Sequence, residues 1–413
     1  MKFDTLIIGG GLAGLTAGIS LLRAGQNVAI VSAGQSALHF CSGSFELLGN
    51  AGAPGKESFR EAMERLPESH TYRKVGYEGV KRILHGVKPF FAEIGIELKG
   101  HPEKTDYRLT PIGLFKPAWL TLSDHLTVEH PDKLPFKKVA IINVRGYIDF
   151  YPHFLASAFD KHGVESIEAT FDTSGIDHLR KSSTEMRSTT MARVITHGQI
   201  DTMARELNEK SKGCDAILIP AVLGLYGPED VALLRSKVDK PVWFVPTIPA
   251  NVPGVRTQLM LAEYFKSHGG VYFLGDTAVG GKVKGSKIEG INTYNLGDIP
   301  LAADNYIFAS GSFFSHGIIA NMERVYEPVL GLDVNAPADR EKWYDKDVYA
   351  PQPFMTYGAL TDHDFHPSIH GAPLGNAYAI GAFVGGTNHM REQSGAGTSI
   401  VSALYVADKI LKR

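Results

Sequence analysis

Residues 3–18 read FDTLIIGGGLAGLTAG, an apolar strand that passes through three consecutive glycines into a helix of small residues. Gly9, Gly11 and Gly14 have the G-x-G-x-x-G spacing, and Asn27–Val31 follows as a second strand. In this context the first glycine permits a tight turn, the second lets a phosphate approach the backbone, and the third lets helix and strand pack closely. The helix N-terminus adds unpaired N–H groups and a partial positive charge. The stretch therefore predicts a nucleotide-binding βαβ unit.

Length and composition narrow the class of protein. The chain has 413 residues, 44% of them hydrophobic and 21% charged, which is typical of a soluble globular enzyme with more than one domain. A net charge of −2 without a basic run disfavours nucleic acid as a partner. Cys41 and Cys214 are the only cysteines, too few for an iron–sulfur cluster or a cysteine zinc site. No apolar run is long enough to span a membrane.

Strands and helices alternate through the middle of the chain, which predicts a second parallel α/β layer. The expected strands are Val139–Val144, Ser166–Phe171, Ala216–Pro220 and Val242–Val245, and the expected helices are Phe150–Lys161, Gln199–Glu209 and Glu229–Val238.

The last third of the chain supplies elements that complete the opening motif. It reads as a helix at Arg256–His268, strands at Val271–Leu274, Ala303–Ala309 and Ala377–Ile380, a glycine-rich hairpin over 275–294 and a closing helix at Thr398–Leu411. We therefore expect an α/β fold, a Rossmann-like FAD/NAD(P)-binding flavoprotein fold with a large inserted α/β domain. Residues 1–50 and 254–413 form the two parts of the expected flavin-binding domain, and residues 51–253 form the insert.

These blocks resemble flavoproteins with two dinucleotide-binding domains, and the resemblance implies a set of cofactor-binding residues. Ser42, Gly43 and Ser44 occupy the place where related flavoproteins hold phosphate, and Ser32 lies near the expected ribose. Small residues near the ribityl chain and isoalloxazine ring let backbone N–H groups approach the cofactor. The full expected set is Gly9, Gly11, Gly14, Ser32, Ser42, Gly43, Ser44, Gly311, Gly381, Gly385, Gly386, Gly395 and Gly397.

Two carboxylates that related flavoproteins carry are absent. No acidic residue ends the second strand, where one usually binds the adenosine ribose, and Ala382 rather than Asp follows Gly381. The first absence favours the mononucleotide FMN. FAD stays open as the alternative because the Ser32 hydroxyl can still bind a ribose hydroxyl.

Five runs of sequence make the resemblance more specific. The runs FDTLIIGGGLAGLTAG, GQSALHFCSGSFELLG, ASGSFFSHG, EPVLGLDV and APQPF resemble the B subunit of the anaerobic glycerol-3-phosphate dehydrogenases, over essentially the whole chain. The resemblance implies an FMN flavoprotein that works with an FAD-containing A subunit and an iron–sulfur, membrane-anchoring C subunit. That complex oxidises glycerol 3-phosphate to dihydroxyacetone phosphate and passes electrons to quinone, with fumarate or nitrate as terminal acceptors. The implied location is cytoplasmic, attached through partners to the inner face of the cell membrane.

Oxidation of an alcohol by flavin needs a base near the hydroxyl group and cations for the phosphate, so His39 and Arg391 are the catalytic candidates. Arg187, Arg193 and Arg256 could also bind phosphate, but a solvated face is the commoner role for such arginines.

Other site chemistries find little support. No metal site is expected from Asp362, His363, Asp364, His366 and His370, because no helix places them on one face. The absence of a G-x-S-x-G elbow leaves hydrolysis unsupported.

Two other functions stay open at this point. One is a structural or electron-relay subunit with a degenerate flavin site, which the missing carboxylates favour. The other is a stand-alone flavin or NAD oxidoreductase.

Overall fold

The first sheet gathers strands from both ends of the chain. The computed structural model describes residues 1–182 and 184–413. In the sheet, β1 (Lys2–Ile8) lies between β2 (Val28–Ser32) and β16 (Ala302–Phe308), with β13 (Val271–Leu274) and β21 (Ala377–Ala379) at the edges. All pairings are parallel. Near-continuous apolar strands are typical of a parallel sheet covered on both faces. The predicted Rossmann-like fold is confirmed.

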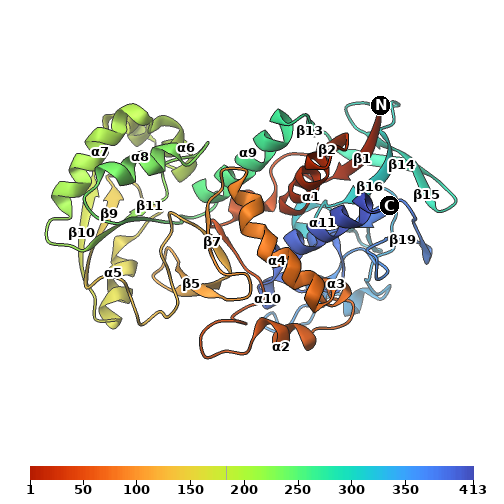
Figure 1. Cartoon of the computed structure of the whole chain (residues 1–413), viewed down its shortest axis with the longest axis horizontal. Coiled ribbons are helices and arrows are strands. Elements are labelled where there is room, and N and C mark those ends of the chain that lie inside the picture. The colour runs from red at the N-terminus through yellow and green to blue at the C-terminus, as the bar shows by residue number, and fades with distance from the viewer. Residues whose placement is uncertain (183) are drawn as a thin grey trace.

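Helices from the two ends of the chain pack on each other beside this sheet. α1 (Leu12–Arg23) contacts α11 (Gly395–Leu411) along its length and also contacts α9 (Val252–Ser267) (Figure 1). Leu15 and Val401 are completely buried there, and each such side chain contributes about 1.5–3 kcal/mol through burial. The N-terminal motif and the closing helix thus belong to one core.

A second parallel sheet forms the other end of the molecule (Figure 1). Its strand order is β10-β9-β11-β12, and its buried side chains form a hydrophobic core separate from the first. The strands and helices are β9 (Lys138–Val144), β10 (Glu165–Phe171), β11 (Ala216–Pro220), β12 (Val242–Val245), α5 (Pro152–Lys161), α6 (Ser188–Val194), α7 (His197–Lys210) and α8 (Glu229–Lys237).

Residues 59–98 extend the first core. α4 (Tyr77–Ala92) buries Val80, Leu84 and Phe91 against it, and α2 (Phe59–Glu64) and α3 (Thr71–Val75) precede it. The segment therefore packs with the first sheet, although the sequence-based division assigns it to the insert. The division at residues 50 and 253 stays a prediction.

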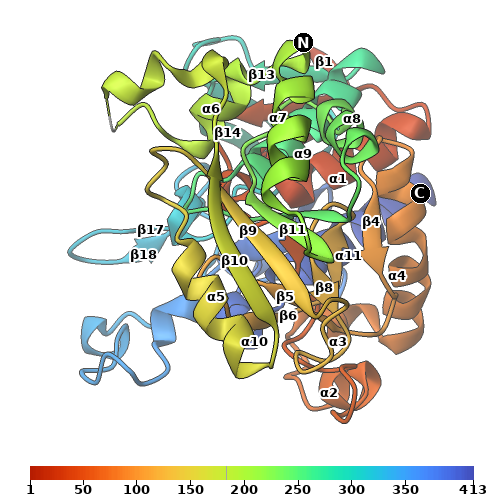
Figure 2. The same cartoon turned by 90° about the vertical axis from the view of Figure 1, so that its left-hand side faces the viewer.

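Two small antiparallel sheets connect the cores, and short hairpins complete the chain. The predicted glycine-rich hairpin is confirmed, and the hairpin β17–β18 stands away from the body in Figure 2. No helix in the described part of the chain is long and apolar enough to cross a bilayer. The elements are β3 (Ser44–Phe45), β7 (Leu120–Leu122) and β4 (Leu98–Gly100); β6 (Phe115–Ala118), β5 (Asp106–Leu109) and β8 (Thr127–Val128); β14 (Ala278–Lys284) and β15 (Lys287–Thr293); β17 (Ile319–Ala320) and β18 (Val325–Tyr326); β19 (Ser368–Ile369) and β20 (Ala372–Pro373); and α10 (His389–Glu392).

Candidate flavin site

The three motif glycines have different local roles. A Cβ on Gly9, whose φ is +118°, would lie 2.2 Å from the Ala309 carbonyl oxygen, and one on Gly14 would lie 1.9 Å from the Gly9 oxygen. These two positions permit the close approach of β1, α1 and β16. A Cβ on Gly11 would meet only Ser36, at 3.6 Å, so the backbone there is open to an incoming group.

The N-terminus of α1 at Gly11 suits an anion. Gly11 is the N-cap, no side chain caps the helix, and its first turn has no acidic residue. Free N–H groups and the helix dipole then favour a phosphate. The open cradle at Gly11 therefore fits the phosphate of a flavin nucleotide.

Side chains fill the other side of this loop, toward β2 and β13. A Cβ on Gly10 would be 2.2 Å from the Tyr272 hydroxyl oxygen and 2.7 Å from the Ser32 Oγ. The Gln258 Nε2 donates to the Gly10 carbonyl oxygen at 3.4 Å, and its Oε1 accepts from the Ser36 hydroxyl at 2.7 Å. The sequence thus lacks the acidic residue that usually binds the adenosine ribose, and polar side chains crowd the same place.

The late glycines Gly311 and Gly381 lie at the same edge of the first sheet. Both have positive φ; Gly311 follows β16, which pairs with β1, and Gly381 follows β21, which pairs with β16. A Cβ on Gly381 would be 2.8 Å from the Cβ of Ala13 in α1. The structure therefore brings these two predicted residues together with Gly9, Gly11 and Gly14.

The four glycines of the C-terminal loop divide into packed and open positions. A Cβ on Gly385 would be 2.5 Å from Asn335 Oδ1, and one on Gly397 would be 2.1 Å from the Tyr72 hydroxyl oxygen. Close protein packing accounts for these two glycines without a cofactor. Gly386 has a positive φ, and a Cβ on Gly395 would meet only His389, at 3.6 Å. Gly395 is the member of this set that leaves space.

The loop at residues 39–44 packs on the start of α9. A Cβ on Gly43 would be 2.7 Å from Pro253, and the Ser42 and Ser44 hydroxyl oxygens lie 2.9 Å apart. His39 is half-buried, its Nδ1 has no hydrogen-bond partner among the described residues, and burial lowers its pKa. The assignments of His39, Ser42, Gly43 and Ser44 to the reacting and phosphate-binding groups stay predictions.

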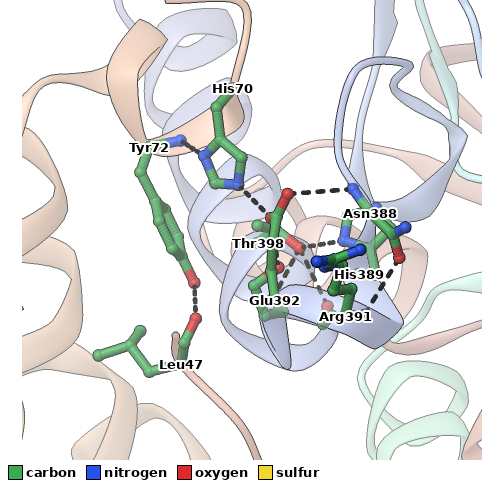
Figure 3. A network of polar contacts seen from close by, with 10 residues as sticks. Leu47, His70, Tyr72, Asn388, His389, Arg391, Glu392 and Thr398 are labelled. Atoms are coloured by element: carbon green, nitrogen blue, oxygen red, sulfur yellow. Dashed lines mark hydrogen bonds and ion pairs between the residues drawn. The ribbon is translucent and has the colours of Figure 1, made fainter. Parts of the chain in front are cut away.

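A histidine that no sequence motif marks lies in the C-terminal loop (Figure 3). Thr398 donates its hydroxyl proton to the Ser394 carbonyl oxygen at 2.9 Å, so its oxygen accepts from His389 Nδ1 at 3.2 Å. His389 Nε2 then carries an unshared lone pair, and it is buried without a partner among the described residues. Burial lowers the pKa of His389 to about 4. At neutral pH the imidazole is an uncharged acceptor.

A neighbouring carboxylate fixes the conformation of this loop. His70 Nδ1 accepts from the Tyr72 N–H at 3.1 Å, so His70 Nε2 is the nitrogen that donates to Glu392 Oε2, also at 3.1 Å. Burial alone would raise the pKa of Glu392, but the hydrogen bonds from His70 and the Asn388 N–H, together with the nearby histidines, outweigh burial and the pKa is lowered. Figure 3 shows that these contacts join α3 to α10.

Arg391 lies on α10 in this network, but its side chain is exposed. Its backbone N–H donates to Asn388 Oδ1 at 3.1 Å, and its guanidinium forms no ion pair within 4.0 Å with residues 1–182 or 184–413. Its expected role in contacting an anion stays a prediction.

The expectation that Arg256 lies on a solvated face is wrong. Its side chain is 6% exposed and donates to Asp124 Oδ2 at 2.6 Å. The carboxylate that neutralises it comes from a loop 132 positions earlier, which no local sequence pattern could indicate. Arg187, by contrast, pairs with Asp149 at 2.8 Å on an exposed surface, and Arg193 is exposed.

Asp362 and His366, which lie in the His- and Asp-rich stretch 362–370, have structural partners. Asp362 accepts the backbone N–H groups of Asp364 and His366, and His366 Nδ1 lies 2.7 Å from the Ala377 carbonyl oxygen. Across the described ranges, no group of three potential metal ligands comes together.

Comparison with known proteins shows the family to which the chain belongs. Residues 4–398 match the sequence profile of the FAD binding domain family, so the chain belongs by class to the FAD binding domain proteins. It is 39% identical over 417 residues to the B subunit of the anaerobic glycerol-3-phosphate dehydrogenase of Yersinia enterocolitica, a match that covers 100% of this chain and 98% of the relative. The same subunit of Pectobacterium carotovorum is 38% identical (100% and 99% covered), and that of Haemophilus influenzae is 33% identical (100% and 100%). The chain belongs to the family of anaerobic glycerol-3-phosphate dehydrogenase B subunits, as the resemblance predicted.

His389 gives a testable pH dependence of stability. Its folded pKa, about 4, lies below the value of 6.5 for a free histidine, so the unfolded chain takes up the proton first as the pH falls. The contribution of this group to the free energy of unfolding is complete above pH 6.5 and declines toward pH 4, by up to about 1.4 kcal/mol per pH unit. Urea denaturation of wild type and His389→Gln between pH 7 and 4.5 should show a shallower decline in the variant.

The matched control is His85→Gln, because His85 is exposed on α4. That variant should keep the wild-type slope. Parallel profiles for His389→Gln and wild type would contradict a neutral, buried His389.

Proposed function

We propose that this chain is the flavin subunit of a heteromeric sn-glycerol-3-phosphate dehydrogenase that forms dihydroxyacetone phosphate and passes electrons to quinone. Its partners are an FAD-containing A subunit and an iron–sulfur C subunit that anchors the complex to the inner face of the cell membrane. The observation that carries the proposal is an open phosphate cradle at Gly11, in a chain whose full-length relatives bear this subunit's name.

FMN is the proposed cofactor, with FAD as the alternative. The residues that would hold it are Gly11 and the N-terminus of α1 at the phosphate, with Gly381 and Gly395 toward the ring. The polar cluster of Ser36, Gln258 and Tyr272 supports a mononucleotide, because it occupies the side of the loop toward which an adenosine half extends.

When bound, the flavin supplies the two-electron acceptor for oxidation of the substrate alcohol. The chain contributes groups that hold and orient the reactants. The unshared lone pair on His389 Nε2 can accept a hydrogen bond or a proton from a ligand, and the unpartnered Nδ1 of His39 offers a second hydrogen-bonding atom. The Glu392–His70 hydrogen bond keeps the His389 loop in place, and an exposed Arg391 is available to an anion.

An electron-relay role is the second candidate function. Its support is the Gly381–Ala382 sequence, where the ribityl-binding Asp of related flavoproteins is missing, and the Gly381 N–H donates instead to the Ser402 hydroxyl at 2.9 Å. In this version the chain carries electrons between its partners, and the A subunit alone oxidises the substrate.

The test begins with the purified chain, from which heat releases any bound flavin for chromatographic identification. Release of FMN in about equal molar amount supports the proposal, release of FAD supports the alternative cofactor, and a colourless chain contradicts a flavin subunit. The complex is then assembled with and without this chain, and glycerol 3-phosphate oxidation is followed with a quinone analogue. Unchanged quinone reduction without the chain would exclude both catalytic and relay roles.

A further inference from the structure

Arg108 on β5 is a largely buried cation that has no directly bonded counterion among the described residues. Its Nε is buried and has no hydrogen-bond partner among residues 1–182 and 184–413. Its guanidinium makes no ion pair within 4.0 Å in that part of the chain. Burial lowers the pKa of Arg108. Charged groups are rarely buried unless an opposite charge or a ligand compensates the lost hydration. No described residue in direct contact with the Arg108 guanidinium provides this compensation.

A second cation stands directly opposite. In the antiparallel pairing of β5 with β6, Arg108 is in register with Lys116, so both side chains project from the same face of the sheet. Like charges at opposed positions destabilise a sheet. An anion between the two side chains would convert this repulsion into attraction.

Glu46 faces the same space and does not neutralise the cations by direct contact. Burial raises the pKa of Glu46, whereas the charges of Arg108 and Lys116 lower it. Its carboxylate forms no ion pair within 4.0 Å with a described residue. The Cys41 thiol lies nearby, and burial raises its pKa to about 11, so it contributes no negative charge at neutral pH.

The pair of cations lies close to the candidate flavin site. The Glu46 carbonyl oxygen accepts from the Gly397 N–H at 2.9 Å, in the first turn of α11. Thr398, the next residue, holds His389. In Figure 1, β5 lies between the second sheet and α10, the helix that carries His389 and Arg391.

We propose that Arg108 and Lys116 bind the phosphate group of a small phosphate monoester and that Glu46 accepts a hydrogen bond from its hydroxyl group. The inference rests on the proposed function and adds that this chain has its own substrate-recognition site. A phosphate monoester carries a charge of about −1.5 to −2 at pH 7, which matches the two cations. The planar fork of arginine binds two phosphate oxygens at once.

The test is calorimetric titration of the purified full chain with sn-glycerol 3-phosphate, inorganic phosphate and glycerol. Arg108→Gln should weaken binding of glycerol 3-phosphate by about 10- to 100-fold, and Lys116→Gln should weaken it less. Arg60→Gln is the matched control, because Arg60 is an exposed arginine paired with Glu64, and it should bind like wild type. Inorganic phosphate should compete, and glycerol should not bind.

Thermal unfolding without ligand separates binding from a structural role. Because Arg108 has no hydrogen bond or ion pair with a described residue to lose, Arg108→Gln should unfold at about the wild-type temperature or above it, whereas a structural arginine would lower the midpoint when replaced. Equal affinities of wild type and Arg108→Gln, or no binding of either phosphate probe by wild type, would overturn the inference.

Flavin content and quinone reduction by the complex are read separately. If they are normal while phosphate does not bind, this inference fails and the proposed function stands. If glycerol 3-phosphate binds through Arg108 but the chain holds no flavin, the phosphate site stands and the proposed function fails.

Discussion

Replacing Gly11 with glutamate is expected to abolish flavin retention and to give a colourless protein. A side chain at this position has room, since only the Ser36 side chain lies near, at 3.6 Å. The new carboxylate would extend into the space before the α1 N-terminus, where the flavin phosphate is expected. Two like charges about 4 Å apart repel by about 4 kcal/mol at an effective dielectric constant of about 20, which weakens binding by roughly 1,000-fold. The measurement is flavin absorbance per mole of purified protein.

Two further variants separate charge and size from misfolding. Gly11 has φ −87° and ψ −169°, an extended conformation open to any residue. Gly11→Ala should therefore fold and keep most of its flavin. Gly11→Gln has the size of glutamate without its charge and should fall between the two. A full complement of flavin in a folded Gly11→Glu protein would show that the phosphate binds elsewhere.

The sequence predicted the parallel strands well because each is a short apolar run bounded by turn residues. The predicted bounds of β11, β12 and β13 agree with the structure at both ends. The small sheets that contain β3 to β8 were missed, because strands of two to four residues have no periodicity that can be recognised. α4 was also missed, although Val80, Leu84, Val87 and Phe91 recur at helical spacing and could have indicated it.

Of the candidate site, too, the sequence could predict one part and not the other. The sequence located the glycines but could not separate cofactor contact from packing, because the neighbours that crowd Gly385 and Gly397 are Asn335 and Tyr72, both distant along the chain. Arg108 and His389 belong to no motif. Each is a candidate ligand-binding residue because it has a buried nitrogen atom without a hydrogen-bond partner among the described residues. This property exists only after folding.

Arg256→Met is expected to lower the free energy of unfolding by about 3–5 kcal/mol at pH 7, the usual cost of breaking one partner of a buried ion pair. The Arg256 and Asp124 side chains are 6% and 7% exposed, and an N–O distance of 2.6 Å joins them. His125 Nδ1 also lies 2.6 Å from Asp124 Oδ1. Methionine keeps most of the length of the arginine, so the main change is the loss of the positive charge. The buried Asp124 carboxylate then keeps only the neutral His125 as a neighbour. Urea denaturation, followed by circular dichroism, measures the loss.

The pH dependence of the stability loss in Arg256→Met tests whether the loss comes from the missing positive charge. Burial alone would raise the pKa of Asp124, but Arg256 and His125 together hold it below its ordinary value. In wild type this carboxylate therefore stabilises the fold above the pKa of about 3.9 for an unfolded aspartate, and the stabilisation is lost as the pH falls toward the folded pKa. Without Arg256, burial dominates and the pKa rises, so the carboxylate takes up a proton at higher pH. The stability difference between variant and wild type should then shrink from pH 7 to pH 4.

Two controls decide between a broken ion pair and lost packing. Lys282→Met breaks an exposed pair with Glu289, at 77% and 38% exposure, and should cost less than about 1 kcal/mol. Adding Asp124→Asn to Arg256→Met removes the stranded charge and should recover part of the loss at pH 7. If Arg256→Met costs no more than Lys282→Met, the buried pair does not stabilise the junction of α9 with the loop between β7 and β8. If the double variant recovers nothing, the loss comes from packing of the arginine side chain, because no buried charge then remains to be relieved.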